Sequence, residues 1–218
     1  MASSVSCTAP TKSGISAPSS TPSVRNANII NVSVFLRKLR RFFISRPSSS
    51  NRERNIGNSL LEWPDRAKAA AALIRGLNLT SPRIADYGCG KQTLRRFLED
   101  DSTYIPFDFV QRSPDTRIRD FNRNDPPGHF DVGCCLGVLE YLDEPLRVLR
   151  RLIESNAFVV FSYNGPTEHS RRHLEGWINA LTFDQLESCI KDCGSTIVAR
   201  EELGRNERLY LVSGKGKQ

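Results

Sequence analysis

The sequence predicts a doubly wound α/β fold: a mostly parallel sheet with helices on both faces and a C-terminal antiparallel hairpin. From about residue 60 onward, short apolar runs alternate with segments of helical spacing, which is typical of parallel α/β sheets. The run 130–136 is almost continuously apolar, as in a strand covered on both faces. The runs 195–199 and 208–212 are too close together for a crossover helix, so they must pair antiparallel.

The remaining elements follow from periodicity and from helix-start and turn residues. A first helix begins at Trp63-Pro64, because proline suits the first helical turn and residues 66–77 are rich in alanine and leucine. The other expected strands are 83–87, 104–107, 116–119 and 157–161, and the other expected helices are 93–99, 145–153 and 183–193.

The chain divides into two parts of different composition. Residues 60–218 form one expected globular domain, whereas residues 1–59 are rich in serine and arginine and contain few bulky apolar groups. Such a segment buries too little apolar area to offset ordering entropy, so we expect a largely disordered extension. Its scarcity of acidic residues also resembles an organelle transit peptide, which would place the protein in an organelle matrix rather than the cytoplasm.

One stretch of the extension, residues 32–44, has apolar residues at helical spacing with arginine and lysine between them. This pattern predicts a basic amphipathic helix. Such a helix suits peripheral contact with an anionic membrane surface, and it equally suits packing of its apolar stripe against the domain.

The net charge of +7 belongs to the extension rather than to the domain. Residues 1–60 carry nine Lys/Arg and one acidic residue, and the rest of the chain carries 22 basic and 23 acidic residues. The domain is therefore nearly neutral, and we expect no nucleic-acid partner for it. The six cysteines show no paired C-x-x-C spacing, which disfavours a zinc site and indicates a reducing compartment, the cytoplasm in the first instance.

The first strand is followed by Asp86-Tyr87-Gly88-Cys89-Gly90. Two glycines let the backbone turn sharply and come close to a ligand, because neither has a Cβ atom. The next predicted helix would present free N–H groups to the same ligand.

These residues resemble the signature of class I S-adenosylmethionine-dependent methyltransferases. Residues 130–132 (FDV) and 137–145 (GVLEYLDEP) similarly resemble the fourth-strand motif of the small-molecule type, and the resemblance covers residues 67–212 in the expected order. It implies a Rossmann-like fold that binds S-adenosyl-L-methionine and transfers its methyl group. The chain departs from the family at Gln92, where the pattern usually has glycine.

The resemblance also assigns cofactor-binding residues at the first two strands. Gly88, Cys89 and Gly90 would flank the methionine portion, and Asp86 would orient the loop or the cofactor's ammonium group. Asp108 ends the second strand about twenty residues past the glycines, where a carboxylate accepts both ribose hydroxyls.

Four further positions follow the third and fourth strands. By resemblance, Asp120 would lie near the adenine amino group and Phe121 against the adenine ring, although Asp120 also suits a plain turn start. Leu136 and Gly137 would lie near the methyl-donor end. We expect the next residues, Glu140 and Tyr141, to open the following helix rather than to take part in chemistry.

The candidate catalytic residues lie after the fifth strand, at the carboxyl end of the sheet, where open α/β folds bind ligands. We hypothesise that His169 or His173 is the base and that Arg171 or Arg172 holds an anionic acceptor; a solvated charged loop is the alternative interpretation. His129 precedes the fourth strand and is expected at the surface.

The function predicted from the sequence is methylation of a small-molecule, lipid-linked or glycan acceptor at oxygen or nitrogen. No Asn-Pro-Pro-aromatic or Asp-Pro-Pro-aromatic motif of amino-directed nucleic-acid methyltransferases follows the fourth strand, and the Pro-Cys nucleophile of the cytosine-carbon type is missing. Two alternatives remain. One is a non-catalytic S-adenosylmethionine-binding module, and the other is a nicotinamide- or nucleotide-sugar-dependent enzyme, disfavoured by Thr93 and the terminal hairpin.

Overall fold

The computed structural model describes residues 63–167, 172–204 and 206–216. The predicted extension 1–59 and its amphipathic stretch 32–44 lie outside these ranges, so both stay predictions, as does membrane contact. Within the described ranges, no helix combines the length and apolar character that a membrane crossing requires.

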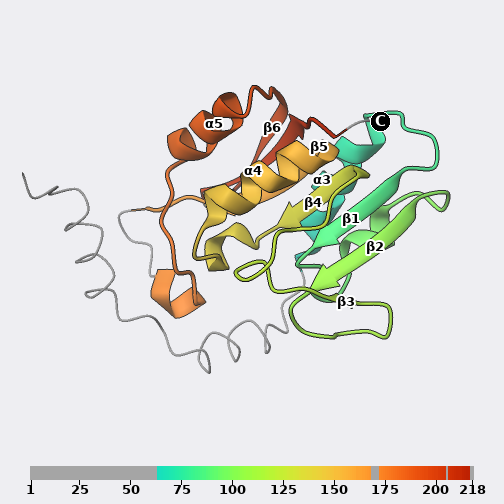
Figure 1. Cartoon of the computed structure of the whole chain (residues 1–218), viewed down its shortest axis with the longest axis horizontal. Helices are drawn as coiled ribbons and strands as arrows, with labels where there is room; N and C mark the ends of the chain where they lie inside the picture. Colours follow the sequence, from blue (N-terminus) through green and yellow to red (C-terminus); the bar gives the residue numbers. More distant parts are fainter. Residues whose placement is uncertain (1–62, 168–171, 205, 217–218) are drawn as a thin grey trace, which may run out of the picture. The chain divides into compact units, whose positions relative to one another are not determined.

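The core of the described domain is a seven-stranded sheet in the order β3-β2-β1-β4-β5-β7-β6 (Figure 1). Its strands are β1 (Arg83–Tyr87), β2 (Thr103–Asp108), β3 (Arg117–Ile118), β4 (Phe130–Leu136), β5 (Asn156–Asn164), β6 (Ile197–Gly204) and β7 (Glu207–Ser213). Strands β1 to β5 pair in parallel, whereas β7 runs antiparallel to both β5 and β6. The predicted parallel sheet with a terminal hairpin is therefore confirmed.

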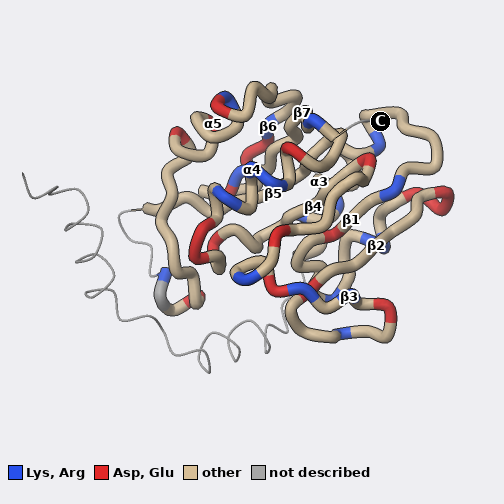
Figure 2. Tube along the Cα trace, in the orientation of Figure 1, with Lys and Arg blue, Asp and Glu red and all other residues tan. Residues whose placement is uncertain are grey.

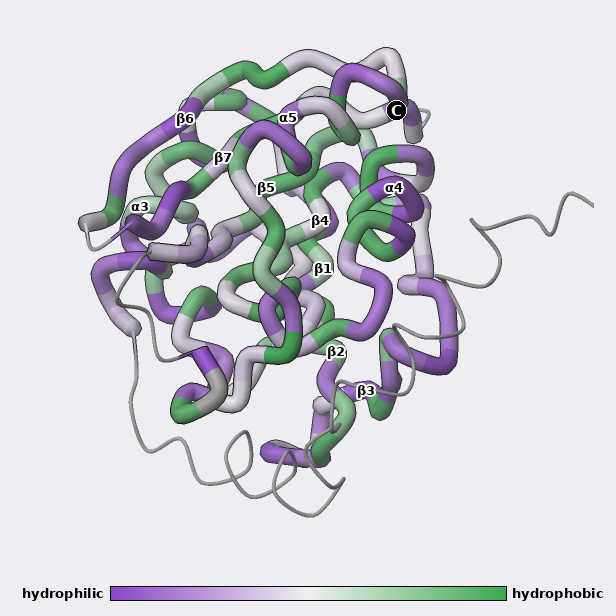
Figure 3. Tube along the Cα trace, turned by 90° about the vertical axis from the view of Figure 1, so that its left-hand side faces the viewer, coloured by the Kyte–Doolittle hydropathy of each residue, from purple (hydrophilic) through white to green (hydrophobic). Residues whose placement is uncertain are grey.

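Helices cover both faces of this sheet. Helix α3 (Pro64–Arg75) and the 3-10 helix η1 (Leu94–Phe97) pack on one face, and α4 (Pro145–Ser155) and α5 (Phe183–Asp192) pack on the other (Figure 1). Each face has its own cluster of buried apolar side chains. In Figure 3 the apolar residues gather along the central strands, and much of the peripheral chain is hydrophilic.

Alternation along β5 assigns its side chains to the two faces. Phe161 and Tyr163 belong to the core on the α4 side, whereas Val160 belongs to the core on the α3 side. Since successive side chains point to opposite faces, Ser162 and Asn164 lie on the α3 side at the carboxyl end of the strand.

Two predictions about helices differ from the structure. The expected helix 93–99 is reduced to η1, because Leu98 is already extended. Glu140 and Tyr141 do not open the following helix, so that prediction is wrong: they lie in a separate 3-10 helix, η2 (Leu139–Tyr141), and α4 begins only at Pro145. Leu142 is extended between them, and the proline ring fixes the first turn of α4.

Candidate active site

The loop after β1 needs glycine where it approaches the rest of the protein. Gly88 and Gly90 have φ values of 80° and 50°. A Cβ atom on Gly88 would lie 2.3 Å from Val138 Cγ2, whereas a Cβ atom on Gly90 would meet nothing within 4 Å. The loop is thus closed against protein at Gly88 and open at Gly90, where a ligand can approach bare main chain.

Asp108, at the end of β2, is joined to this loop. Its side chain is buried, its Oδ2 accepts a hydrogen bond from Gly90 N at 2.9 Å, and its Oδ1 accepts one from Val110 N at 3.0 Å. Arg112 Nε lies 3.9 Å from Oδ2. A carboxylate has about four lone-pair sites, so two more hydrogen bonds can be accepted from a ligand's hydroxyls.

Asp86 is the second buried carboxyl group at this edge. It accepts a hydrogen bond from the hydroxyl of Tyr104 on β2 at 2.6 Å. The pKa of Asp86 is raised to about 7, mainly by burial; the Tyr104 hydrogen bond opposes this shift, and the nearby Asp108 charge adds to it. A cationic group placed beside Asp86 would favour its ionised form.

The thiol of Cys89 lies in the same loop and is buried. Burial, together with the charges of Asp86 and Asp108, raises its pKa well above the ordinary thiol value. The thiol therefore stays protonated at neutral pH and serves packing rather than nucleophilic chemistry.

Gln92 explains how the chain tolerates its departure from the glycine pattern. The residue has φ 57°, a conformation that costs a side-chain-bearing residue about 1–2 kcal/mol. Its Nε2 donates to Ser113 Oγ at 2.6 Å and to Asp115 Oδ1 at 2.9 Å. These bonds tie the glycine loop to the segment between β2 and β3 and offset the strain.

Asp120 and Phe121, which follow β3, are engaged in contacts within the protein. Asp120 Oδ1 accepts a hydrogen bond from Asn122 N at 2.9 Å, which is the local geometry of a turn-starting aspartate. The Phe121 ring is buried and packs edge-on against Tyr87 at 5.7 Å between ring centroids. It contributes to the core, and its contact with an adenine ring stays a prediction.

Leu136 and Gly137 end β4 next to the start of α3. Gly137 has φ 67°, and a Cβ atom there would lie 2.1 Å from Nη1 of Arg66. Arg66 in turn forms an ion pair with Glu207, the first residue of β7, at 2.5 Å. Sequence reasoning missed Arg66 and Glu207, because no local pattern brings a first-turn arginine and a strand-start glutamate together.

Glu140 was assigned no chemistry from the sequence, yet it is a buried carboxyl group at the carboxyl end of β4 and β5. Its Oε1 accepts hydrogen bonds from Asn164 N at 2.8 Å and from Asn164 Nδ2 at 3.2 Å. Burial raises its pKa. The signal that could have found it is a glutamate in an otherwise apolar run, GVLEYL.

Of the three histidines, only His129 is described in full. His129 is exposed, and its N–H donates to Ser155 O at the amino end of β4, away from the glycine loop. The backbone of His173 lies in the 3-10 helix η3 (Arg172–Glu175), but its side chain lies outside the described part of the structure, as does all of His169. Their predicted role as base stays a prediction.

Arg172 is buried and three of its five N–H donors are engaged within the protein, which disfavours the hypothesised role of holding an acceptor, and Arg171 lies outside the described residues. Its Nε donates to Asn179 O at 2.7 Å, its Nη1 to Asn164 O at 2.7 Å and its Nη2 to the Tyr163 hydroxyl at 3.2 Å. The guanidinium also lies over the ring of Trp177. Arg172 therefore fixes the segment after β5 onto the end of the sheet.

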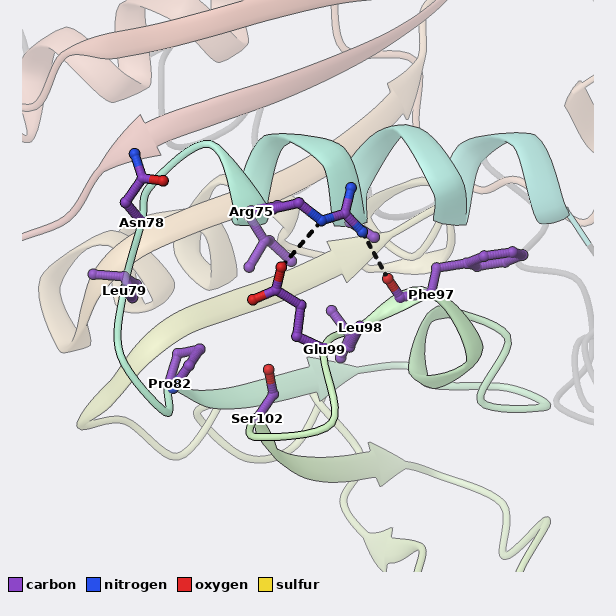
Figure 4. Close-up of a pocket in the computed structure, with 10 residues that line it drawn as sticks. Arg75, Asn78, Leu79, Pro82, Phe97, Leu98, Glu99 and Ser102 are labelled. Carbon is purple, nitrogen blue, oxygen red and sulfur yellow. Dashed lines mark hydrogen bonds and ion pairs between the residues drawn. The ribbon is translucent and has the colours of Figure 1, made fainter.

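A hollow of about 270 Å³ lies elsewhere, near the amino ends of β1 and β2. Figure 4 shows Arg75 and Glu99 pointing toward one another across its lining, with Arg75 Nε 3.2 Å from Glu99 Oε1. Its place at the opposite end of the strands separates it from the candidate site. Among the described residues, no group of three or more histidine, cysteine, aspartate or glutamate side chains could hold a metal ion.

The strand order and the glycine loop define an architecture, that of class I S-adenosylmethionine-dependent methyltransferases. No family model matches the chain, and no curated protein sequence matches it. Solved structures do match it. One is Burkholderia thailandensis 1,6-didemethyltoxoflavin-N1-methyltransferase with bound 1,6-didemethyltoxoflavin and S-adenosylhomocysteine, at TM-score 0.57 and 16% identity over 88% of this chain and 93% of that one.

Two further structures show the same likeness. Magnesium protoporphyrin IX methyltransferase from Synechocystis PCC 6803, with S-adenosylhomocysteine bound, has TM-score 0.56 and 15% identity over 82% of this chain and 99% of that one. The pyocyanin biosynthetic protein PhzM has TM-score 0.52 and 16% identity over 67% of this chain, which spans only 54% of PhzM. At these identities the likeness shows the class I methyltransferase fold.

Proposed function

We propose that the protein is an S-adenosylmethionine-dependent methyltransferase that acts on a small-molecule acceptor. The observation that carries the proposal is the pairing of an open glycine loop with a carboxylate one strand away. Gly90 faces open space, and Asp108 is bound to the same loop through Gly90 N. Together they suit a ligand that has both a charged amino-acid end and a ribose.

The donor would lie across the carboxyl ends of β2, β1 and β4. Asp108 accepts the ribose hydroxyls, the segment 88–90 lies along the methionine portion, and Asp86 faces its ammonium group. Gly137, with Leu136 beside it, adjoins the sulfonium, because these residues end β4 next to the glycine loop. In this arrangement Asp120 lies near the adenine amino group.

Methyl transfer from a sulfonium is an in-line displacement that releases a neutral thioether. The protein's main task is to hold the acceptor atom in line with the methyl carbon, and alignment alone contributes about 7–11 kcal/mol. An acceptor that keeps its proton at neutral pH also needs a base.

The near neutrality of the domain supports a small molecule over a nucleic acid. Figure 2 shows basic and acidic residues interspersed along the described chain. Within the class of small molecules we include lipid-linked and glycan acceptors, methylated at oxygen or nitrogen. All five cysteines of the described segments are free and buried, which supports a reducing compartment, the cytoplasm or an organelle matrix.

A thermal-shift comparison of the purified full chain tests the proposed cofactor. S-adenosylmethionine and S-adenosylhomocysteine should each raise the melting temperature, because a ligand that binds only the folded state stabilises it. NAD should have no effect; a shift with NAD alone would instead favour a nicotinamide enzyme. Transfer of labelled methyl groups into small molecules then separates an enzyme from a non-catalytic binding module.

A further inference from the structure

We propose that Glu140 contacts the methyl acceptor and takes its proton, and that the acceptor is therefore a compound with an N–H or O–H group. This inference rests on the proposed methyltransferase function and names the substrate class of the same site.

The strand order fixes where the acceptor must lie. The donor extends from Asp108 on β2 across β1 to Gly137 at the end of β4, so its methyl group points beyond β4. The next strands in the sheet are β5 and β7. Glu140, in η2 directly after β4, is bound to the end of β5 through Asn164 and so lies at this corner.

Apart from Arg66 Nε and Glu207 Oε1, which form an ion pair with each other, two buried polar atoms at the corner have no hydrogen-bond partner in the described structure. They are Oε2 of Glu140 and Oγ of Ser162, whose residues are 1% and 0% exposed. Ser162 precedes Asn164 by two residues on β5 and shares its face of the sheet. A buried polar group without a partner is costly, and a carboxylate especially so, which points to a partner supplied by a ligand.

The charges around Glu140 favour an acceptor that is not an anion. Arg66 pairs with Glu207 at 2.5 Å, and its positive charge also acts on Glu140, where it opposes the larger effect of burial on the pKa. The other charged or titratable side chains near it are Arg172, which donates to Asn164 O at 2.7 Å, and Tyr141, Tyr163 and Cys135, which stay neutral because burial raises their pKa values. A carboxylate acceptor would be repelled there, whereas a phenol, alcohol or amine can donate to Oε2.

The chemical step then balances. The lone pair of the acceptor heteroatom forms the new bond to the methyl carbon, the carbon–sulfur bond breaks, and its electron pair stays on the thioether sulfur. The heteroatom's proton moves to Oε2 of Glu140 and later to water. Because burial raises the pKa of Glu140, its ionised form is a stronger base than an ordinary carboxylate.

The test substitutes the carboxylate while keeping its structural hydrogen bonds. In Glu140→Gln the amide oxygen can still accept from Asn164, but the amide cannot take a proton. The matched control is Glu144→Gln, since Glu144 is exposed and pairs with Arg147 on the surface. Each full-length variant is assayed with methyl-labelled S-adenosylmethionine and a panel of phenols, arylamines and carboxylic acids.

We expect Glu140→Gln to lower kcat about 10²- to 10⁴-fold on a phenol or amine, with donor affinity unchanged by calorimetry. The control should keep wild-type turnover. The kcat of the wild type should fall at low pH with a single ionisation, and this measurement needs no variant to fold.

Three results would overturn the inference: full turnover by Glu140→Gln, a wild-type kcat that is flat with pH, or methylation of carboxylic acids alone. If the wild type neither binds the donor nor transfers a methyl group, the proposed function fails first, and the role of Glu140 fails with it.

Discussion

The two sides of the candidate site are built differently. On the donor side, at β1 and β2, the polar groups are bonded to one another: Asp108 to Gly90 and Val110, and Asp86 to Tyr104. On the acceptor side, at β4 and β5, Glu140 keeps one buried oxygen unpaired. The proposed donor side thus has its hydrogen bonds formed before any ligand binds, whereas on the proposed acceptor side one carboxylate oxygen is left for a ligand.

The largest effect on stability should come from adding a side chain at Gly88, where the glycine loop packs against protein. Gly88→Ala adds a Cβ atom 2.3 Å from Val138 Cγ2 at a positive φ. Strain and overpacking together should lower the free energy of unfolding by about 2–4 kcal/mol, measured by chemical denaturation.

Gly90→Ala is the matched control in the same loop. Its φ is also positive, but the new Cβ atom meets nothing within 4 Å. We expect a stability loss of only about 1 kcal/mol together with weaker donor binding, because the added atom occupies space that faces the ligand. Equal stability losses in the two variants would contradict the distinction between a closed and an open half of the loop.

A smaller effect is expected from pH, which should change donor affinity through the ionisation of Asp86. Burial raises the pKa of Asp86 to about 7 in the unliganded protein, and a bound cation favours its ionised form. Binding therefore releases a proton, and donor affinity should fall about tenfold between pH 8 and pH 6. Asp86→Asn should bind weakly and with little pH dependence, as calorimetry at both pH values would show.

The same pKa shift affects folding in the opposite direction. Because the folded state holds the proton more tightly than the unfolded state, the contribution of Asp86 to stability is fully present below its ordinary pKa of 3.8. It is lost as the pH rises through about 7. In denaturation experiments, Asp86→Asn should remove this part of the pH dependence.

The smallest effect should come from restoring the glycine of the family pattern at Gln92. Gln92→Gly loses the bonds to Ser113 and Asp115 but also loses the strain at φ 57°, so stability should change by less than about 1 kcal/mol. Gln92→Ala loses the bonds and keeps the strain, and should be destabilised by about 1–2 kcal/mol. A Gln92→Gly variant less stable than Gln92→Ala would contradict this expectation, because it would show that the backbone strain at residue 92 is not relieved by glycine.

The donor side could be predicted from the sequence because its determinants are local. Strands 83–87 and 130–136, the two glycines and the strand-end position of Asp108 all follow from short-range patterns, and the structure places them as expected. The hairpin of β6 and β7 could also be predicted from the sequence, since its short connection excludes a crossover helix.

The acceptor side could not be predicted, because its contacts join distant segments. Glu140 was assigned to the wrong element, since a proline three residues after Leu142 decides where α4 begins. The pairing of Arg66 with Glu207 joins the first described helix to the last strand, and no spacing rule relates them. Arg172 lies in a polar run of the sequence, which suggested a ligand contact. In the structure its guanidinium instead donates hydrogen bonds to backbone carbonyl and hydroxyl groups of the protein.

Titration calorimetry with S-adenosylhomocysteine tests the central claim most directly, using the full-length wild type and Asp108→Ala. The wild type should bind one equivalent, and the variant should bind about ten- to hundredfold more weakly, because hydrogen bonds to a charged acceptor contribute about 1.5–3 kcal/mol. No binding by the wild type, or equal affinity in the two proteins, would contradict the account.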